Sequence, residues 1–386
     1  MATILPFGAI RPNPNYIDQL IQCKAQAESV AGKGLLPLKQ LLETPARIRP
    51  ETQEGQEAAY SWINATLNAL FMNDQLIKEP EPRIFIYEVS NPSHSQTGVW
   101  ALTSLVDMPS IKTHELTFPD SVRRLRNYRE HTGLEGSPVL LTYTPDAAVN
   151  RLIQHVKASE THTTMGNSQG IHRLWKITDI ALQKQLTEAF ERIGTIYLAD
   201  GHHRVESAMQ LLPRYNTLSS LYMATDQLQF QPYDRIVVPY RPISKSIFLQ
   251  QLAGDFEISK NWDNLPVRPE RSRHFGLFIE NTWYHLIFRG TARQTDAALV
   301  QEKIFAPLFG ITDSQNDPRL TCTGGQQAMA ELLAFAALNP GAVCFTLCPL
   351  TAEQLMDASD RGENLPPKST WIDPKVPYGL LLYRHT

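Results

Sequence analysis

The sequence has few cysteines, no long apolar run and no excess of charge of either sign. Its four cysteines form no CxxC pair, which argues against a disulfide framework and favours a reducing compartment. The 36 basic and 39 acidic side chains give a net charge of −3, which excludes a bulk electrostatic hold on nucleic acid. No stretch approaches the roughly 18 apolar residues of a transmembrane helix. A secretory signal, with a basic start and a long apolar run, is also missing at the N-terminus. We therefore expect a cytoplasmic globular protein with no nucleic-acid or membrane partner.

The common nucleotide and hydrolase motifs are absent too. There is no GxxxxGK[ST] loop, no kinase HRD or DFG, no GxSxG and no HExxH. If this protein handles a nucleotide, it does so with a less common fold.

What the sequence does contain is an alternation of predicted strands and helices, which indicates an α/β or α+β fold. Residues 275–290 form a predicted hairpin turning at Glu280-Asn281, so the sheet is expected to be mixed. At 386 residues the chain is long enough for two or three domains. We expect an N-terminal strand and helices over 1–80, a core over 80–260 and a C-terminal α/β part over 261–386 that packs on the core.

The strongest local motif is Asp200-Gly-His-His-Arg204, where an apolar strand meets a helix predicted to start at Val205. Gly201 allows a tight turn and the close approach of a ligand. The helix start, two imidazoles and a guanidinium offer hydrogen bonds to phosphate oxygens. Two other interpretations stay open. Asp200 could be a helix N-cap among surface histidines, or the motif could bind a metal, although adjacent histidines rarely hold one ion together.

Two further segments carry charge that could serve a site. Lys112-Thr-His-Glu115 places charged side chains beside a possible proton acceptor. The alternative is that these four residues are an ordinary charged loop exposed to solvent. In Pro366-Pro-Lys-Ser-Thr-Trp371 the prolines hold the backbone extended, which lowers the entropic cost of fixing Lys368 on a phosphate. The alternative is an ordinary surface tail.

These motifs resemble a bacterial domain-of-unknown-function family, number ten-fifteen in that series. The resemblance covers nearly the whole chain and is carried by LPFGAIRPN (5–13), SHSQTGVW (93–100), IKTHELTFPD (111–120), IYLADGHHRVESA (196–208) and NLPPKSTWIDPK (364–375). One departure is that residues 16–40 lack the PPYDV-like segment usual in that family.

The family is similar in turn to the free-serine kinases (SerK) and to the ParB amino-terminal domain, which implies a ParB/SerK-like core over 80–260. In the serine kinases a His-Glu pair supplies the catalytic base, and the DGHHR loop holds the nucleotide phosphates and the substrate. Here 85 residues separate Glu115 from Asp200, so insertions must lie between them. The resemblance implies that Glu115 is the base and that His202 and Asp200 are also catalytic. It implies phosphate or nucleotide contacts from Gly201, His202, His203, Arg204, Lys112 and Lys368. It implies substrate contacts from His114, Ser369 and Thr370.

The function so implied is phosphoryl transfer from ATP or ADP to the hydroxyl of a small metabolite, by family analogy free L-serine. Mg²⁺ would be held through the phosphates, with help from Asp200. The alternative is a non-catalytic nucleotide-binding regulator of ParB-like type, in which a homodimer interface responds to the nucleotide. A regulator needs the DGHHR loop but no base, so Glu115 separates the two hypotheses.

Overall fold

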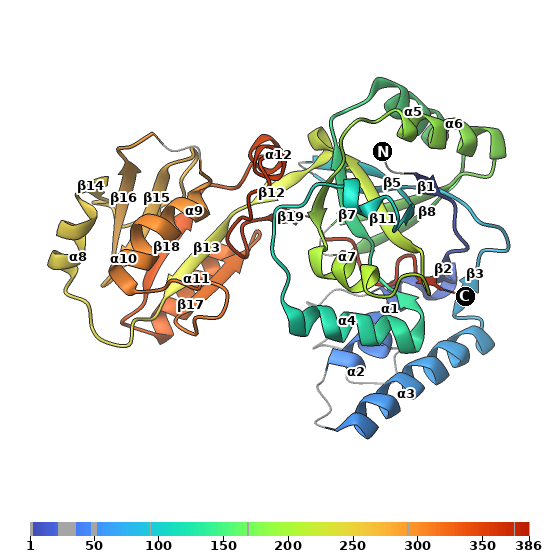
Figure 1. Cartoon of the computed structure of the whole chain (residues 1–386), viewed down its shortest axis with the longest axis horizontal. Coiled ribbons are helices and arrows are strands. Elements are labelled where there is room, and N and C mark those ends of the chain that lie inside the picture. The colour runs from blue at the N-terminus through green and yellow to red at the C-terminus, as the bar shows by residue number, and fades with distance from the viewer. Residues whose placement is uncertain are drawn as a thin grey trace. The chain divides into compact units, whose positions relative to one another are not determined.

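The computed structural model describes residues 3–21, 36–47, 52–92, 94–167, 170–291, 294–373 and 375–385 (Figure 1). Its contacts form two compact units. The first unit contains Met1–Thr113, Thr117–Leu228 and Pro374–Thr386, and the second contains His114–Leu116 and Gln229–Asp373.

This division differs from the three parts expected from the sequence. Residues before 80 share a hydrophobic core with the strands that follow, so they form no separate part. Strand β13 (Tyr233–Val237) pairs within the sheet of the second unit, which moves the boundary from 261 to 228.

The first unit is built on a sheet of eight strands, and this sheet is mixed, as the sequence predicted for the fold. Strands β7 and β11 run parallel, and the other neighbouring pairs run antiparallel. The strand order is β10 (Tyr197–Asp200), β7 (Val139–Tyr143), β11 (Thr217–Ala224), β5 (His94–Ser104), β4 (Phe85–Asn91), β9 (Gly170–Lys176) and β8 (His162–Asn167), with β1 (Ile4–Leu5) also paired to β5.

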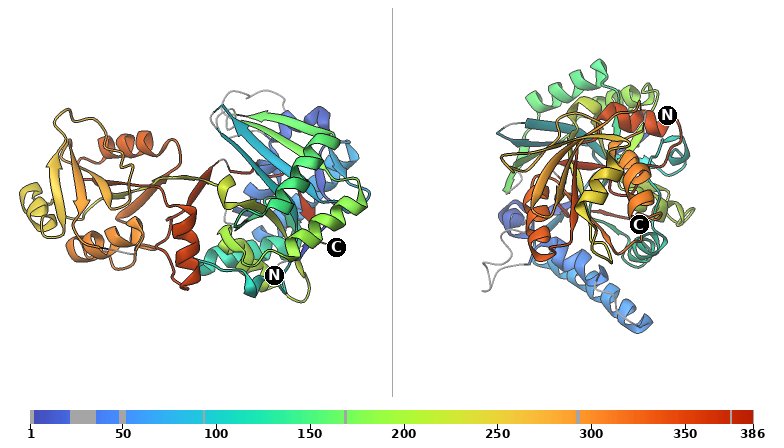
Figure 2. Two further views of the ribbon diagram at one scale, coloured as in Figure 1. Left: turned by 90° about the horizontal axis from the view of Figure 1, so that it is seen from above. Right: turned by 90° about the vertical axis from the view of Figure 1, so that its left-hand side faces the viewer.

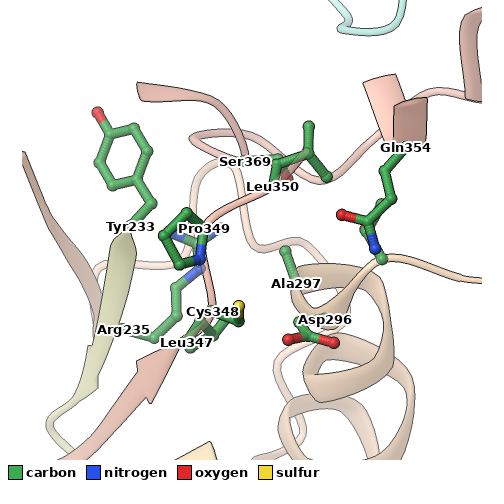
Figure 3. A pocket seen from close by; sticks show the side chains of 11 residues that line it. Tyr233, Arg235, Asp296, Ala297, Leu347, Cys348, Pro349, Leu350, Gln354 and Ser369 are labelled. Atoms are coloured by element: carbon green, nitrogen blue, oxygen red, sulfur yellow. The ribbon is translucent and has the colours of Figure 1, made fainter. Parts of the chain in front are cut away.

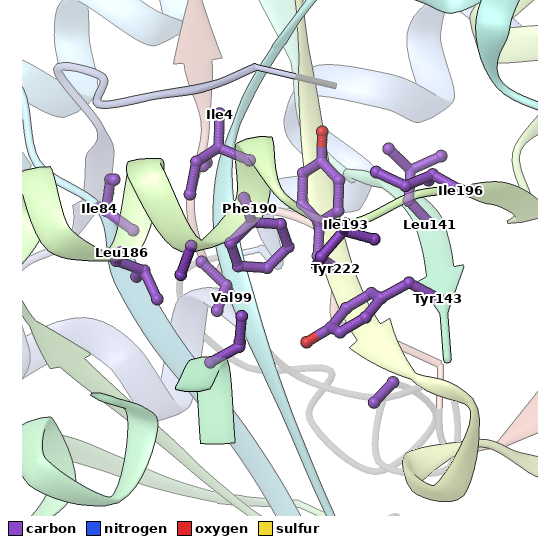
Figure 4. Close-up of a cluster of buried hydrophobic side chains, with 14 of the residues drawn as sticks. Ile4, Ile84, Val99, Leu141, Tyr143, Leu186, Phe190, Ile193, Ile196 and Tyr222 are labelled. Atoms are coloured by element: carbon purple, nitrogen blue, oxygen red, sulfur yellow. The ribbon is translucent and has the colours of Figure 1, made fainter. Parts of the chain in front are cut away.

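Successive side chains along each strand point to opposite faces of this sheet, and both faces are covered by a hydrophobic core. Ile86 and Val99 belong to one core, which α5 (Ala147–Ser159) and α6 (Ile180–Glu191) cover with their apolar stripes (Figure 4). Phe85, Tyr87 and Trp100 belong to the core on the opposite face, with side chains of α1 (Ile17–Leu20), α3 (Gln53–Met72) and residues 380–382. The sheet is thus a middle layer, and the C-terminal segment is part of its packing.

Shorter elements complete the first unit. Three further helices belong to it: α2 (Thr44–Arg47), α4 (Pro119–Thr132) and α7 (His202–Met209). It also contains two short antiparallel strand pairs, β2 (Ile10–Pro12) with β3 (Leu76–Lys78) and β6 (Leu134–Glu135) with β20 (Tyr383–Arg384). Helix α4 ends at Thr132, and its C-cap Gly133 adopts the left-handed conformation with φ +69° that favours glycine.

The second unit contains a six-stranded antiparallel sheet with helices on both faces. Its predicted hairpin is confirmed, since Glu280 (φ +45°) and Asn281 (φ +56°) form the turn between β15 and β16. The strand order is β14 (Phe256–Lys260), β16 (Thr282–Phe288), β15 (His274–Ile279), β18 (Val343–Leu347), β13 and β17 (Leu320–Gly324).

Each face of this sheet has its own hydrophobic core, and the sheets of both units can be followed in two further views (Figure 2). One core contains α8 (Lys245–Leu252), α9 (Asp296–Val300) and α10 (Ala306–Phe309), and the other contains α11 (Ala328–Leu338). Helix α12 (Ala352–Asp360) and the pair β12 (Gln229–Gln231) with β19 (Trp371–Asp373) complete the unit. None of the helices in the described ranges combines the length and the hydropathy needed to cross a membrane.

Candidate functional site

The DGHHR motif lies where β10, an end strand of the first sheet, turns into α7. The pairing of β10 with β7 shifts register between Leu198 and Asp200, and such a bulge redirects the side chains beside it. The N-cap of α7 is Gly201 and its first residue is His202, three positions earlier than predicted. Both histidines and Arg204 therefore lie in the first turn of the helix. The N-cap interpretation of Asp200 is wrong, because Gly201 holds that position.

Gly201 is required at this turn for two reasons. Its φ of +105° is a conformation that residues with a side chain rarely adopt. A Cβ there would also lie 2.9 Å from Cγ1 of Val139 and 3.1 Å from Nε and Nη2 of Arg204. The guanidinium thus packs directly over the glycine.

We expect Gly201→Ala to destabilise the first unit by about 1–3 kcal/mol, through backbone strain and displacement of Arg204. Urea unfolding measures the loss. Gly194→Ala is the matched control, because a Cβ on Gly194 meets no atom within 4 Å. Equal stability of the two variants would contradict the strain argument.

Asp200 binds two cations at once. Its Oδ2 accepts a hydrogen bond from Nη2 of Arg204 at 2.6 Å, and its Oδ1 accepts one from Nζ of Lys375 at 3.2 Å. Nη1 of Arg204 donates to the carbonyl of Pro138. These two bonds use two of the five guanidinium N–H groups of Arg204.

The same pairing controls the charge of Asp200. Burial by itself would raise the pKa of this carboxyl, but Lys375 and Arg204 outweigh burial and lower its pKa to about 2. Because the folded pKa lies below the ordinary 3.8, the pairing stabilises the fold above pH 3.8 and is lost as the pH falls toward 2.

We expect wild type to be more stable than Asp200→Asn at pH 7, with the difference disappearing near pH 2. Thermal unfolding across this range checks the sign, and a difference that grew on acidification would contradict it.

His203 is oriented by the start of α4. The backbone N–H of Phe118 donates to Nε2 of His203 at 2.9 Å, and the two rings stack with centroids 5.2 Å apart and planes 7° apart. Since Nε2 accepts, the imidazole is neutral with its proton on Nδ1. His203 is thus positioned as a neutral donor through Nδ1.

Lys112 lies along the other edge of β10. Its backbone N–H donates to the carbonyl of Ile196 at 3.0 Å, and its carbonyl accepts from the N–H of Leu198 at 2.9 Å. These bonds form a short parallel bridge to Tyr197. The chain before the KTHE segment is therefore fixed to the strand that ends in Asp200.

A cavity of about 550 Å³ adjoins Arg204 inside the first unit. Basic side chains outnumber acidic ones in its wall, which favours an anionic occupant. The charged lining residues are Arg47, Arg124, Arg129, Arg204, Glu43 and Glu135.

The remaining candidate residues belong to the second unit. Glu115 forms a parallel bridge with Leu365, whose N–H donates to the carbonyl of His114 at 2.7 Å. Lys368 has φ +61° and an exposed side chain, and Oγ of Ser369 donates to the carbonyl of Pro366 at 2.5 Å. The structure thus gathers Lys112 and residues 200–204 in one unit and His114, Glu115, Lys368, Ser369 and Thr370 in the other.

Asp200 has a positioning role at the strand end. Its two oxygens accept from Arg204 and Lys375, so the carboxylate holds both cations in place.

The sequence analysis did not single out Lys375 or Phe118. Lys375 ends the WIDPK segment and lies 175 positions from its partner Asp200. A second lysine so close to Lys368 was the one available signal. Phe118 precedes Pro119 of α4, and nothing in the sequence around it indicates that its ring stacks on His203.

Comparisons with known proteins give a family and weak structural similarities. A family model described as "Protein of unknown function (DUF1015)" matches residues 4–306. No curated protein matches the chain. Among solved structures, a C-terminally truncated SbnI from Staphylococcus aureus is 13% identical with a TM-score of 0.40, covering 73% of this chain and 87% of that one. A free serine kinase in complex with AMP is 14% identical with a TM-score of 0.39, covering 73% and 92%. A conserved hypothetical protein from Pyrococcus furiosus is 13% identical with a TM-score of 0.38, covering 72% and 93%.

Proposed function

The chain belongs to the DUF1015 family, and from this membership and the charged strand end we propose that it transfers a phosphoryl group from a nucleotide to the hydroxyl of a small metabolite. Free L-serine is the acceptor that the motif resemblance favours, and ATP or ADP is the donor. Phosphoryl transfer needs positioned groups and stabilised charge rather than a covalent intermediate on the protein.

The observation that carries the proposal is the cluster of positive groups around Gly201. Arg204 and Lys375 are held in place by Asp200, and Lys112 lies along the same strand. A glycine without Cβ, followed directly by the first turn of α7, lets phosphate oxygens approach backbone N–H groups. Arginine and lysine so positioned neutralise the charge of a transferring phosphoryl group.

Glu115 is the base in this proposal, and chain connectivity supports its role. Lys112 is hydrogen-bonded to β10, and Phe118 is hydrogen-bonded to His203. Glu115 lies three residues from each anchor, and three extended residues span about 11 Å at most. The segment that carries Glu115 thus begins and ends next to residues that are hydrogen-bonded to β10 and to the DGHHR motif.

The other candidate residues receive secondary roles. His202 and His203 donate to the phosphates together with Arg204 and Lys112. His114, Ser369 and Thr370 contact the acceptor, and Lys368 reaches a phosphate from its exposed turn.

The test is a direct search for product. The full chain is incubated with ATP or ADP, Mg²⁺ and single hydroxy amino acids, and phosphorylated product is followed by ³¹P NMR and mass spectrometry. Formation of a phosphorylated amino acid supports the proposal, with phosphoserine expected first. Nucleotide binding without any product supports the regulator, and an absence of both contradicts the two hypotheses together.

A further inference from the structure

The second unit contains a separate cavity of about 330 Å³ (Figure 3). Its wall combines β13, the end of β18, the start of α9, α12 and the turn after Pro366. Leu347, Leu350 and Ala297 supply apolar surface, while Arg235 and Asp296 supply opposite charges. Ser369, an acceptor contact in the proposed function, also lines this cavity, but the inference rests on Arg235 and Asp296, which have no part in that proposal.

Arg235 is a buried cation that is only partly satisfied. The residue is 3% exposed. Its Nη2 donates to the carbonyls of Pro367 at 3.1 Å and Lys368 at 3.0 Å, and its guanidinium carbon lies 5.7 Å from the ring centroid of Tyr233. Its Nη1 is buried and has no hydrogen-bond partner among the described residues.

Asp296 is a buried carboxylate with one free oxygen. It is 6% exposed and opens α9. Its Oδ1 accepts from Oγ of Ser272 and from the N–H of Arg273, both at 2.8 Å. Its Oδ2 is buried and has no hydrogen-bond partner within the described part of the chain. Burial also raises the pKa of this carboxyl, so the protein's own charges do not offset its desolvation.

Two unsatisfied groups of opposite charge in one cavity are costly unless something pairs with both. Burying an unpaired polar or charged group is unfavourable, and a hydrogen bond between these two side chains would remove that cost. They do not hydrogen-bond each other, because both Nη1 and Oδ2 lack partners. A ligand that carries one anionic and one cationic group would satisfy the two atoms together.

We propose that this cavity binds a free α-amino acid with a small uncharged side chain, whose carboxylate accepts from Nη1 of Arg235 and whose ammonium donates to Oδ2 of Asp296. Leu347 and Leu350 provide the apolar wall against which the side chain would pack. This inference does not depend on the proposed function, since the residues that carry it serve no step of phosphoryl transfer.

The test measures amino-acid binding to the full chain by isothermal titration calorimetry without nucleotide. Glycine, L-alanine, L-serine, L-threonine and L-valine are the probes, and at least one is expected to bind with a Kd below 1 mM (roughly −4 kcal/mol). The N-acetyl derivative of the best probe lacks the ammonium, and its amide lacks the carboxylate. Each is expected to bind at least about 10-fold more weakly, as the loss of a charged hydrogen bond predicts.

Two variants locate the site. Asp296→Asn keeps the Oδ1 acceptor for Ser272 and Arg273 but removes the charge, and we expect about a 10–100-fold weaker Kd. Glu280→Gln, at an exposed hairpin position of the same unit, is the matched control and leaves the Kd unchanged. The proposal is overturned if no probe binds at 10 mM to folded protein, if either derivative binds as tightly as the amino acid, or if Asp296→Asn binds like wild type.

Discussion

Glu115→Gln is expected to lower kcat for phosphoryl transfer by about 10² to 10⁴-fold, the usual cost of removing a general base. Glutamine keeps the size and shape of the side chain but does not accept the hydroxyl proton at neutral pH. The affinity for nucleotide should stay near the wild-type value, because groups other than Glu115 hold the phosphates. Single-turnover kinetics and a separate nucleotide-binding titration measure the two quantities independently.

Two further variants give this prediction its contrast. Arg204→Ala removes a guanidinium that contacts the phosphates before and during transfer, so the KM for nucleotide should rise while kcat falls. Glu188→Gln on α6, half exposed and 3.8 Å from Lys184, should leave both parameters unchanged. If Glu115→Gln turns over like wild type while Arg204→Ala is inactive, the base is another residue.

The second large effect concerns stability. Glu135 is buried and accepts hydrogen bonds from Nε of Arg129 at 2.9 Å, from Nε2 of His385 at 2.8 Å and from the N–H of Ser219 at 2.7 Å. Glu135→Gln replaces one acceptor oxygen by an NH₂ that faces donors and leaves Arg129 as a buried uncompensated cation. We expect a loss of about 3–5 kcal/mol in the free energy of unfolding, measured by urea titration.

Surface and pH controls sharpen this expectation. Glu130→Gln breaks only contacts to Arg126 at 3.9 Å and Arg214 at 3.4 Å on an exposed helix face, so it should cost less than about 1 kcal/mol. Burial would raise the pKa of Glu135, but Arg129 and His385 hold it below the ordinary 4.5. The stability advantage over Glu135→Gln should therefore hold above pH 4.5 and shrink as the pH falls further. A penalty for Glu135→Gln as small as that of Glu130→Gln would show that the network contributes little.

The alternation of strands and helices and the β15–β16 hairpin could be read from the local sequence pattern. The hairpin follows the predicted segment because its two apolar runs flank a turn at Glu280-Asn281. Among the strands that the sequence did not reveal, β8, β14 and β17 lie at the ends of the two large sheets. Edge strands face water on one side and carry polar residues, so they lack the buried pattern that identifies central strands.

The DGHHR motif was also visible in the sequence, because a glycine between an apolar strand and a helix start has few structural explanations. The partners that organise it were not. Lys375 and Asp200 are 175 positions apart, and His385 and Glu135 are 250 apart. No helical or strand periodicity links residues at such separations, so only the folded chain pairs these charges.

By itself, the sequence determined the α/β class, the mixed sheet and the DGHHR motif at a strand end, because local pattern and backbone chemistry decide these features. The tertiary structure alone decided that the C-terminal segment completes the first unit, that Lys375 shares Asp200 with Arg204, and that Arg235 and Asp296 line one cavity. Each of these depends on long-range packing, which brings distant charges into low-dielectric surroundings where their pairing has a large effect on free energy.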